Sequence, residues 1–260
     1  MTTTRIEWAT HVWNPVTGCD RISPGCDNCY AAEMARRLKA MGQAKYRRDG
    51  DPRTSGPGFG VTTHPDTLGD PFTWAKPRRV FVNSMSDLFH ARVPAEFVAD
   101  VWRTMAATPQ HTYQVLTKRP ERLARVLARV HERLGLDKPL PNVWLGTSVE
   151  SADYTRRVDH LRAAPAAVRF LSCEPLLGPL DGLNLAGIHW VIVGGESGRG
   201  ARPLDEAWVR SIVAQCRAAG TAPFIKQLGS VWARRHGGDP KGGDPERWPA
   251  DLRIREFPNL

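Results

Sequence analysis

The 260-residue sequence lacks the features that place a chain in a membrane or in an oxidising compartment. No apolar run is long enough to cross a bilayer, and the start MTTTRIEWATHVW lacks the basic-then-apolar plan of a secretory signal. There are only five cysteines, an odd number that does not suit a framework of disulfides. We therefore expect a cytoplasmic protein with reduced cysteines and no membrane partner.

The sequence also lacks internal repeats and any visible nucleic-acid-binding motif, although its charge is strongly positive. Lysine and arginine number 36 against 27 acidic residues, which gives a net charge of +9. Such an excess suits a polyanion, because neutralised phosphates release their counterions. An ordinary solvated surface explains the charge equally well, so nucleic acid is one of two open interpretations, and the oligomeric state is not indicated.

From residue 80 onward, short apolar runs alternate with amphipathic helical stretches. Continuous apolar runs joined by helical crossovers predict parallel strands that are buried on both faces. With a first strand near residues 5–17, at least seven strands are available, and we predict an α/β fold with a full or partial TIM-type (β/α) barrel. The predicted strands cover residues 80–84, 113–117, 143–148, 168–172, 190–195 and 223–227, and the predicted helices cover residues 30–42, 94–108, 121–135, 153–164 and 206–220.

Two segments depart from this alternation of strands and helices. Residues 43–75 are rich in glycine, proline and charge, and are interpreted as an exposed insertion between the first helix and the second strand. Residues 234–260 are interpreted as an irregular C-terminal tail. The remaining chain, residues 1–233, is predicted to form a single barrel domain.

The most specific motif is GCDRISPGCDNCY in residues 18–30, which contains Cys19, Cys26 and Cys29. A Pro-Gly turn between the first two cysteines lets the three thiolates converge in one loop, and metal binding is the simplest use for them. Iron–sulfur clusters and structural zinc usually take four ligands, so one position stays open. An open iron of a [4Fe–4S] cluster binds a further ligand directly, whereas zinc needs a fourth protein ligand such as a histidine or Cys173.

Three cysteines in a loop after the first strand of a β/α barrel, with Tyr30 beside the last one, resemble the radical S-adenosylmethionine superfamily. The resemblance implies that Cys19, Cys26 and Cys29 hold a [4Fe–4S] cluster whose open iron chelates S-adenosylmethionine. The first gap here is six residues instead of the superfamily's usual three, and the aromatic residue follows the third cysteine instead of preceding it.

Further motifs run from end to end of the chain. EWATHVWNPVTGC, FVNSMSDLFH, VLTKRPERL, VWLGTSVE, LSCEPLLGP, VIVGGESGRGARP and FIKQLG identify it as a member of an uncharacterised phage and bacterial family with a three-cysteine signature. That membership implies little about function.

Polar side chains follow nearly every predicted strand. Because the active site of a β/α barrel is built at the carboxyl ends of its strands, we expect them to surround one opening. Each alone is equally well a cap, a turn or a solvated charge. The catalytic candidates are Cys173, Glu174, Glu150 and Lys118. The cofactor-binding candidates are Asn83, Ser84, Asp87, Ser148, Glu150 and Glu196.

The resemblance refines these candidates. It implies that groups ending the second strand contact the methionine amino group of the cofactor, and that groups ending the fourth contact its ribose. Glu196 lies in a GGE sequence similar to the superfamily's methionine-binding motif but follows a late strand, so that role is not transferred to it. Cys173 is interpreted as a hydrogen donor or an extra metal ligand, with a small buried residue as the alternative.

The leading hypothesis is a radical S-adenosylmethionine-like enzyme that modifies or repairs a nucleic acid, similar to a photoproduct lyase. The rival is a non-catalytic nucleic-acid-binding or redox-sensing protein with a structural cluster or zinc. Among the aromatic residues, Trp8, Trp13 and Trp74 lie outside the regular repeats and are predicted to be available for a substrate surface. Cys216 lies on a helical apolar stripe and is predicted to be core.

Overall fold

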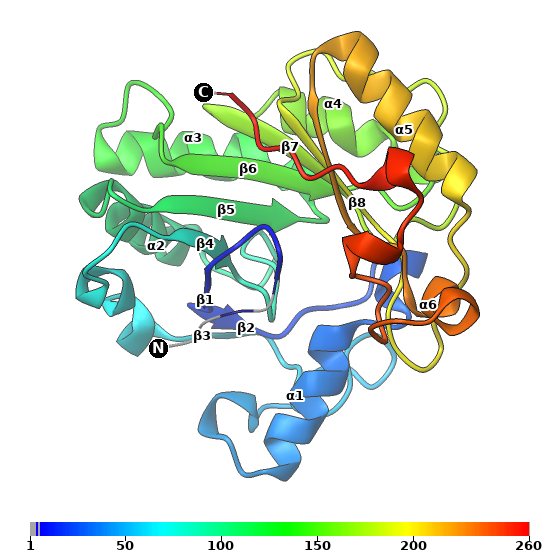
Figure 1. Cartoon of the computed structure of the whole chain (residues 1–260). Coiled ribbons are helices and arrows are strands. Elements are labelled where there is room, and N and C mark those ends of the chain that lie inside the picture. Colours follow the sequence, from blue (N-terminus) through cyan, green and yellow to red (C-terminus); the bar gives the residue numbers. More distant parts are fainter. Residues whose placement is uncertain (1–3, 5, 260) are drawn as a thin grey trace.

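The computed structural model describes residue 4 and residues 6–259, and in this part of the chain the main sheet has seven parallel strands. Their order in space is their order in the sequence, and the sheet is curled into a half barrel (Figure 1). The strands are β1 (His11–Trp13), β4 (Arg79–Val82), β5 (Thr112–Thr117), β6 (Val143–Ser148), β7 (Val168–Cys173), β8 (Trp190–Gly194) and β9 (Ala222–Gln227). The predicted partial barrel is confirmed.

Helices connect most of these strands and cover the outside of the sheet. The predicted helices are all present, as α1 (Tyr30–Ala40), α2 (Ala95–Ala107), α3 (Leu123–Leu134), α4 (Arg156–Arg162) and α5 (Glu206–Ala219). A further short helix, α6 (Ser230–His236), follows β9. No helix in the described residues is long and apolar enough to span a membrane.

The two faces of the sheet have different apolar layers, because successive side chains of a strand point to opposite faces. Leu171 and Val193 belong to the large cluster that includes residues of α2, α3 and α5. Phe170, Trp190 and Phe224 belong to a second cluster that includes no helix residue. The inner face of the half barrel is therefore filled by aromatic side chains, and the outer face by aliphatic contacts with the helices.

The prediction that three tryptophans are available to a substrate is wrong. Trp8, Trp13 and Trp74 are only 2%, 1% and 8% exposed. Trp13 lies in β1, and its indole N–H donates to the carbonyl oxygen of Thr67 at 2.8 Å. Trp8 packs against Trp190 with ring centroids 6.2 Å apart. Cys216 is fully buried, as predicted.

The insertion and the tail both pack onto the barrel. Within residues 43–75, β3 (Thr62–Thr63) pairs antiparallel with β2 (Val16–Thr17), which directly precedes the cysteine loop. In the tail, the carbonyl oxygen of Ile254 accepts from the Ile225 amide at 2.8 Å, and Arg255 forms an antiparallel bridge with Phe224. The tail therefore covers the edge of β9. The division of the chain at residue 233 stays a prediction.

Replacing Trp190 by alanine should strongly destabilise the protein. This side chain is fully buried, contacts Trp8, Trp144, Phe170 and Phe257, and donates to the Glu256 carbonyl oxygen at 2.8 Å. We expect the free energy of unfolding to fall by about 3–5 kcal/mol in urea titrations. Phe72→Ala is the control, because Phe72 is 57% exposed and should change stability by only about 0.5 kcal/mol. Equal losses in the two variants would contradict the aromatic core.

Candidate metal and cofactor site

The cysteine loop begins at a glycine that no other residue can replace without strain. Gly18 has a φ of +84°, and a Cβ atom there would lie 2.3 Å from the Gly60 carbonyl oxygen. Its amide donates to the Met85 carbonyl oxygen at 3.0 Å. The loop therefore starts between the insertion and the segment after β4, and it ends at Cys29, which precedes the first residue of α1.

Cys19 lies against a buried ion pair. Nη1 of Arg119 is 3.3 Å from its Sγ and 3.1 Å from Oδ2 of Asp87. Nη2 of Arg119 donates to the carbonyl oxygen of Asp20 at 3.0 Å. Burial and the Asp87 charge raise the pKa of the Cys19 thiol to about 12 against the opposing effect of Arg119. Metal coordination deprotonates such a thiol outright.

Cys26 lies beside a second buried carboxylate. The Ser23 hydroxyl is 3.7 Å from Sγ of Cys26 and donates to Oε1 of Glu150 at 2.8 Å. Glu150 is fully buried, and it pairs with Lys118 and with Nη1 of Arg157, the latter at 2.8 Å. Burial raises the pKa of Glu150, but the charges of Lys118 and Arg157 outweigh it and keep that pKa below its ordinary value. The carboxylate is thus held ionised.

Next to Cys29, the loop is held by a third carboxylate. The Asn28 amide donates to Oε2 of Glu196 at 2.9 Å. Arg202 donates from Nη2 to Oε1 of the same carboxylate at 2.5 Å and to the Pro24 carbonyl oxygen at 2.9 Å. Burial raises the pKa of Glu196, yet its hydrogen bonds with Arg202 lower it overall. The loop is therefore anchored to polar groups that follow β4, β5, β6 and β8.

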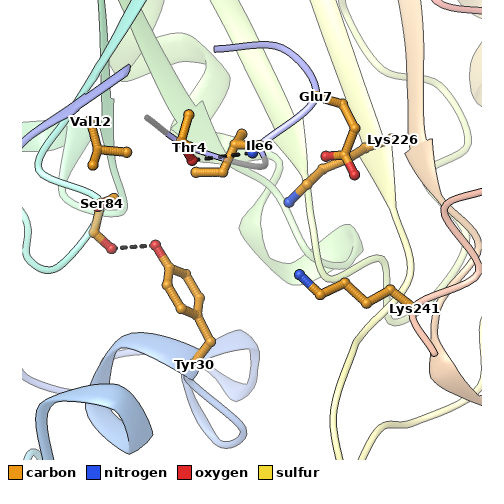
Figure 2. A pocket seen from close by; sticks show the side chains of 8 residues that line it. All are labelled: Thr4, Ile6, Glu7, Val12, Tyr30, Ser84, Lys226 and Lys241. Atoms are coloured by element: carbon orange, nitrogen blue, oxygen red, sulfur yellow. Dashed lines mark hydrogen bonds between the residues drawn. The ribbon is translucent and has the colours of Figure 1, made fainter. Parts of the chain in front are cut away.

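A cavity of about 240 Å³ lies beside this loop, on the side of Tyr30 (Figure 2). The Tyr30 hydroxyl donates to the Ser84 carbonyl oxygen on one side of the cavity. Figure 2 shows the ammonium groups of Lys226 and Lys241 on the opposite side. The remaining lining residues are Thr4, Ile6, Glu7 and Val12. Its wall is therefore partly apolar and partly charged, as in sites for small organic ligands.

Several sequence-predicted residues meet around the cysteine loop, namely Lys118, Glu150, Asp87 and Glu196. Ser84 lines the cavity. Asn83 is buried with a φ of +63°, and its side-chain oxygen accepts from the Val16 amide at 3.3 Å.

The other candidates lie slightly apart. Ser148 is buried, and its carbonyl oxygen accepts from Arg157 at 2.9 Å. Glu174 pairs with Lys226, one of the cavity residues, at 2.6 Å. Cys173 is fully buried in the layer that faces the helices, away from the inner face. The structure does not bring its thiol to the opening of the barrel, because Cys173 follows the strand alternation of Leu171.

Sequence reasoning missed the cations and amides that fix the loop. Arg157 lies in the helix predicted over residues 153–164 and was not singled out, yet it is buried against Glu150. Asn28 and Ser23 belong to the cysteine motif itself, and only their contacts with strand-end carboxylates reveal what they do. Arg202 lies six residues after Glu196, the last residue of the GGE sequence. This nearness in the sequence was the available signal that the two side chains could pair.

Cys19, Cys26 and Cys29 are each partly buried. None of the five cysteines forms a disulfide in the described part of the chain. Within those residues, no three His, Cys, Asp or Glu side chains form a group that could hold a single metal ion. Iron–sulfur clusters are held by cysteine thiolates, so the donor type that this loop offers fits such a group. The buried Arg119 donor at 3.3 Å from Cys19 also suits a thiolate better than a thiol.

Comparisons with known proteins extend this description. The family model described as "Protein of unknown function (DUF5131)" matches residues 3–245. No curated protein matches. Among solved structures, a point mutant of spore photoproduct lyase has a TM-score of 0.50 and 9% identity, over 81% of this chain and 74% of that one. This likeness supports the half-barrel fold.

Two further structures of spore photoproduct lyase also match. One is complexed with a dinucleoside spore photoproduct, with a TM-score of 0.43 and 12% identity over 78% of this chain and 60% of that one. The other, a double mutant with bound AdoMet and the same dinucleoside, has a TM-score of 0.46 and 11% identity over 84% and 63%.

Glu150→Gln should destabilise the protein most at neutral pH. The variant leaves Lys118 and Arg157 without their buried carboxylate, so we expect a loss of about 3–5 kcal/mol in urea titrations at pH 7. The folded-state pKa of Glu150 lies below its ordinary value of 4.5. Its stabilising effect is therefore present above that value and is lost as pH falls through the folded-state pKa.

The difference between the wild type and Glu150→Gln should accordingly shrink as the pH falls below about 4.5. Glu246→Gln is the control, because the Glu246 side chain is 85% exposed and its pairing with Arg253 should contribute little. A difference that widens towards acid pH would show that Glu150 is not held ionised in the folded protein.

Proposed function

We propose that this chain, which belongs to the DUF5131 family, is an iron–sulfur enzyme of the radical S-adenosylmethionine type that acts on a nucleic acid. One observation carries the proposal. The three-cysteine loop lies over the carboxyl ends of a parallel half barrel, tied to the groups that follow four of its strands, and a cavity opens beside it. In β/α barrel enzymes, the active site lies at the carboxyl ends of the strands.

Cys19, Cys26 and Cys29 would hold the cluster. When bound, a [4Fe–4S] cluster with one open iron supplies single electrons and a coordination position for the amino and carboxylate groups of S-adenosylmethionine. The protein's own part is to position the loop through Arg119, Glu150 and their partners. Buried ion pairs of this kind keep a loop in one arrangement.

The cavity beside Tyr30 is the proposed place for the cofactor and the reacting part of the substrate. Lys226 and Lys241 offer ammonium donors to anionic groups, and Glu7 offers a carboxylate to cationic ones. Ile6 and Val12 supply the apolar part of the wall. Such a mixture orients a ligand through a few polar contacts and excludes water around the rest.

A nucleic acid is the proposed substrate for three reasons. The net charge of +9 favours a polyanion through counterion release. Tyr30 is 54% exposed at the cavity, where an aromatic ring offers a face on which a base stacks. Spore photoproduct lyase, whose fold this chain shares, is named for its action on a photoproduct. Repair or modification of a base is therefore the proposed reaction class.

A non-catalytic protein with a structural or redox-sensing cluster is the rival function. Arg119 beside Cys19 would serve such a protein equally well, because hydrogen bonds to ligand sulfurs also tune a sensing cluster. The two functions differ in whether one iron stays open to S-adenosylmethionine.

Anaerobic reconstitution followed by iron and sulfide analysis should show one [4Fe–4S] cluster per chain. Each of Cys19→Ala, Cys26→Ala and Cys29→Ala should lose most of the iron, because three local thiolates leave no spare ligand. Cys216→Ala is the matched control, since Cys216 is buried in α5 away from the loop and should keep the iron.

The electron paramagnetic resonance signal of the reduced protein separates the two functions. Adding S-adenosylmethionine should change the signal of the wild type, because the cofactor binds the open iron. A resonance signal that does not change when S-adenosylmethionine is added would favour the structural or sensing role. Stoichiometric zinc with no iron after reconstitution would reject both iron–sulfur functions.

Single-stranded oligonucleotides should bind at the cavity side of the barrel and bind more weakly as salt rises. Lys241→Glu and Tyr30→Ala should each reduce affinity at least several-fold in fluorescence anisotropy titrations, because they remove a cation and a stacking face from the cavity. Lys138→Glu is the control, since Lys138 is exposed in the loop before β6, at the amino ends of the strands. An equal loss in this variant would point to non-specific charge attraction.

A further inference from the structure

Arg119 stands out among the charged residues near the loop because it touches a cysteine sulfur directly. Its Nη1 is 3.3 Å from Sγ of Cys19, and its Nη2 is 3.0 Å from the carbonyl oxygen of the next residue, Asp20. The residue is only 7% exposed, so solvent and salt screen its charge weakly. A buried guanidinium thus contacts the cysteine side chain and the backbone carbonyl of the next residue.

Asp87 fixes this guanidinium. Its Oδ2 accepts from Nη1 of Arg119 at 3.1 Å and from the Lys118 amide at 3.1 Å. Its Oδ1 accepts from the Thr117 hydroxyl at 2.7 Å and from the Phe89 amide at 3.0 Å. A carboxylate has about four acceptor sites, and these four donors use them. Asp87 is therefore already committed to protein partners and has little capacity left for a cofactor amino group.

We propose that Arg119, which Asp87 holds in place, raises the reduction potential of the cluster bound at Cys19 through its charge and its hydrogen bond to the cysteine sulfur. The inference rests on the proposed function, because it assumes a cluster on the three cysteines. It also gives Asp87 a role that differs from the cofactor contact predicted from the sequence.

The physical reason is the change in charge on reduction. Reduction adds one electron, breaks no bond and makes the cluster and its thiolates one unit more negative. A cation that donates to a ligand sulfur stabilises this more negative state more than the oxidised one. Asp87 has the opposite charge, so its own electrostatic effect on the potential has the opposite sign, while its hydrogen bonds keep Arg119 directed at Cys19.

This difference in sign provides the test. Reconstituted wild type, Arg119→Met and Asp87→Asn are titrated anaerobically with dithionite as the electron donor, and the reduced cluster is followed by electron paramagnetic resonance. Arg119→Met should shift the midpoint to a more negative value, with the equilibrium constant for reduction about tenfold lower, which equals about 59 mV for one electron. Asp87→Asn keeps a side-chain oxygen that can accept from Arg119 and removes the negative charge, so it should shift the midpoint in the positive direction.

Two variants control for charge and folding. Arg119→Lys keeps the charge but loses the second donor to the loop, so its midpoint should lie between those of the wild type and Arg119→Met. Arg92→Met removes an arginine that pairs with Asp20 at 2.6 Å but donates to no sulfur among the described contacts, so it should leave the midpoint close to the wild-type value. Iron content and melting temperature of each variant show whether it folds and holds the cluster.

The outcomes separate the inference from the proposed function. A wild-type protein that binds no cluster rejects the proposed function. A wild-type cluster whose midpoint is unchanged in Arg119→Met, or that shifts in the same direction in Arg119→Met and Asp87→Asn, rejects the inference and leaves the proposed function standing. If Arg119→Met cannot hold iron, the midpoints of Arg119→Lys and Asp87→Asn decide, because a common direction of shift rejects the inference.

Discussion

The structure depends on three buried or nearly buried carboxylates, Asp87, Glu150 and Glu196, at the carboxyl edge of the parallel sheet. Removing a carboxylate from water costs several kcal/mol unless a cation and hydrogen bonds compensate for it. Each one is paired, and every pair also contacts the cysteine loop or a residue next to it. The need to neutralise these charges therefore ties the loop to the barrel.

The need to neutralise buried carboxylates explains why the inner face of the half barrel differs from the carboxyl ends of its strands. On the inner face, Trp190 and its aromatic neighbours fill the space with apolar contacts and give the sheet its stability. At the carboxyl ends of the strands, polar groups replace the aromatic ones, and a cavity stays open beside Tyr30. The apolar packing and the buried ion pairs thus occupy different parts of the half barrel, and both stabilise it.

The fold followed closely from the sequence because its signals are local. Strands predicted at residues 113–117 and 143–148 match β5 and β6 to within a residue, since buried parallel strands are continuous apolar runs. The first strand, predicted over residues 5–17, is split into β1 and β2. Pro15 lies between them and has no amide hydrogen to donate to a ladder.

The site was only partly predictable, because its contacts join residues far apart in the chain. The cysteine spacing predicts a metal loop, but nothing local to Asn28 indicates a hydrogen bond with Glu196, which lies 168 residues later. The tryptophans show the same limit. Trp8 and Trp13 lie outside the regular repeats and were predicted to be available, whereas Trp8 packs against Phe81 of β4 and Trp190 of β8.

The charge balance around the loop agrees with the proposed iron–sulfur function. The three carboxylates are paired with four cations, namely Lys118, Arg119, Arg157 and Arg202, which leaves one positive charge in excess. With neutral thiols, this excess has no counterpart within these pairs. An oxidised [4Fe–4S] core of charge +2 on three thiolates carries a net charge of −1, which balances the excess. Burial and the Asp87 charge raise the pKa of Cys19 above its ordinary value, so in the proposed function the bound metal would have to draw the protons off the thiols.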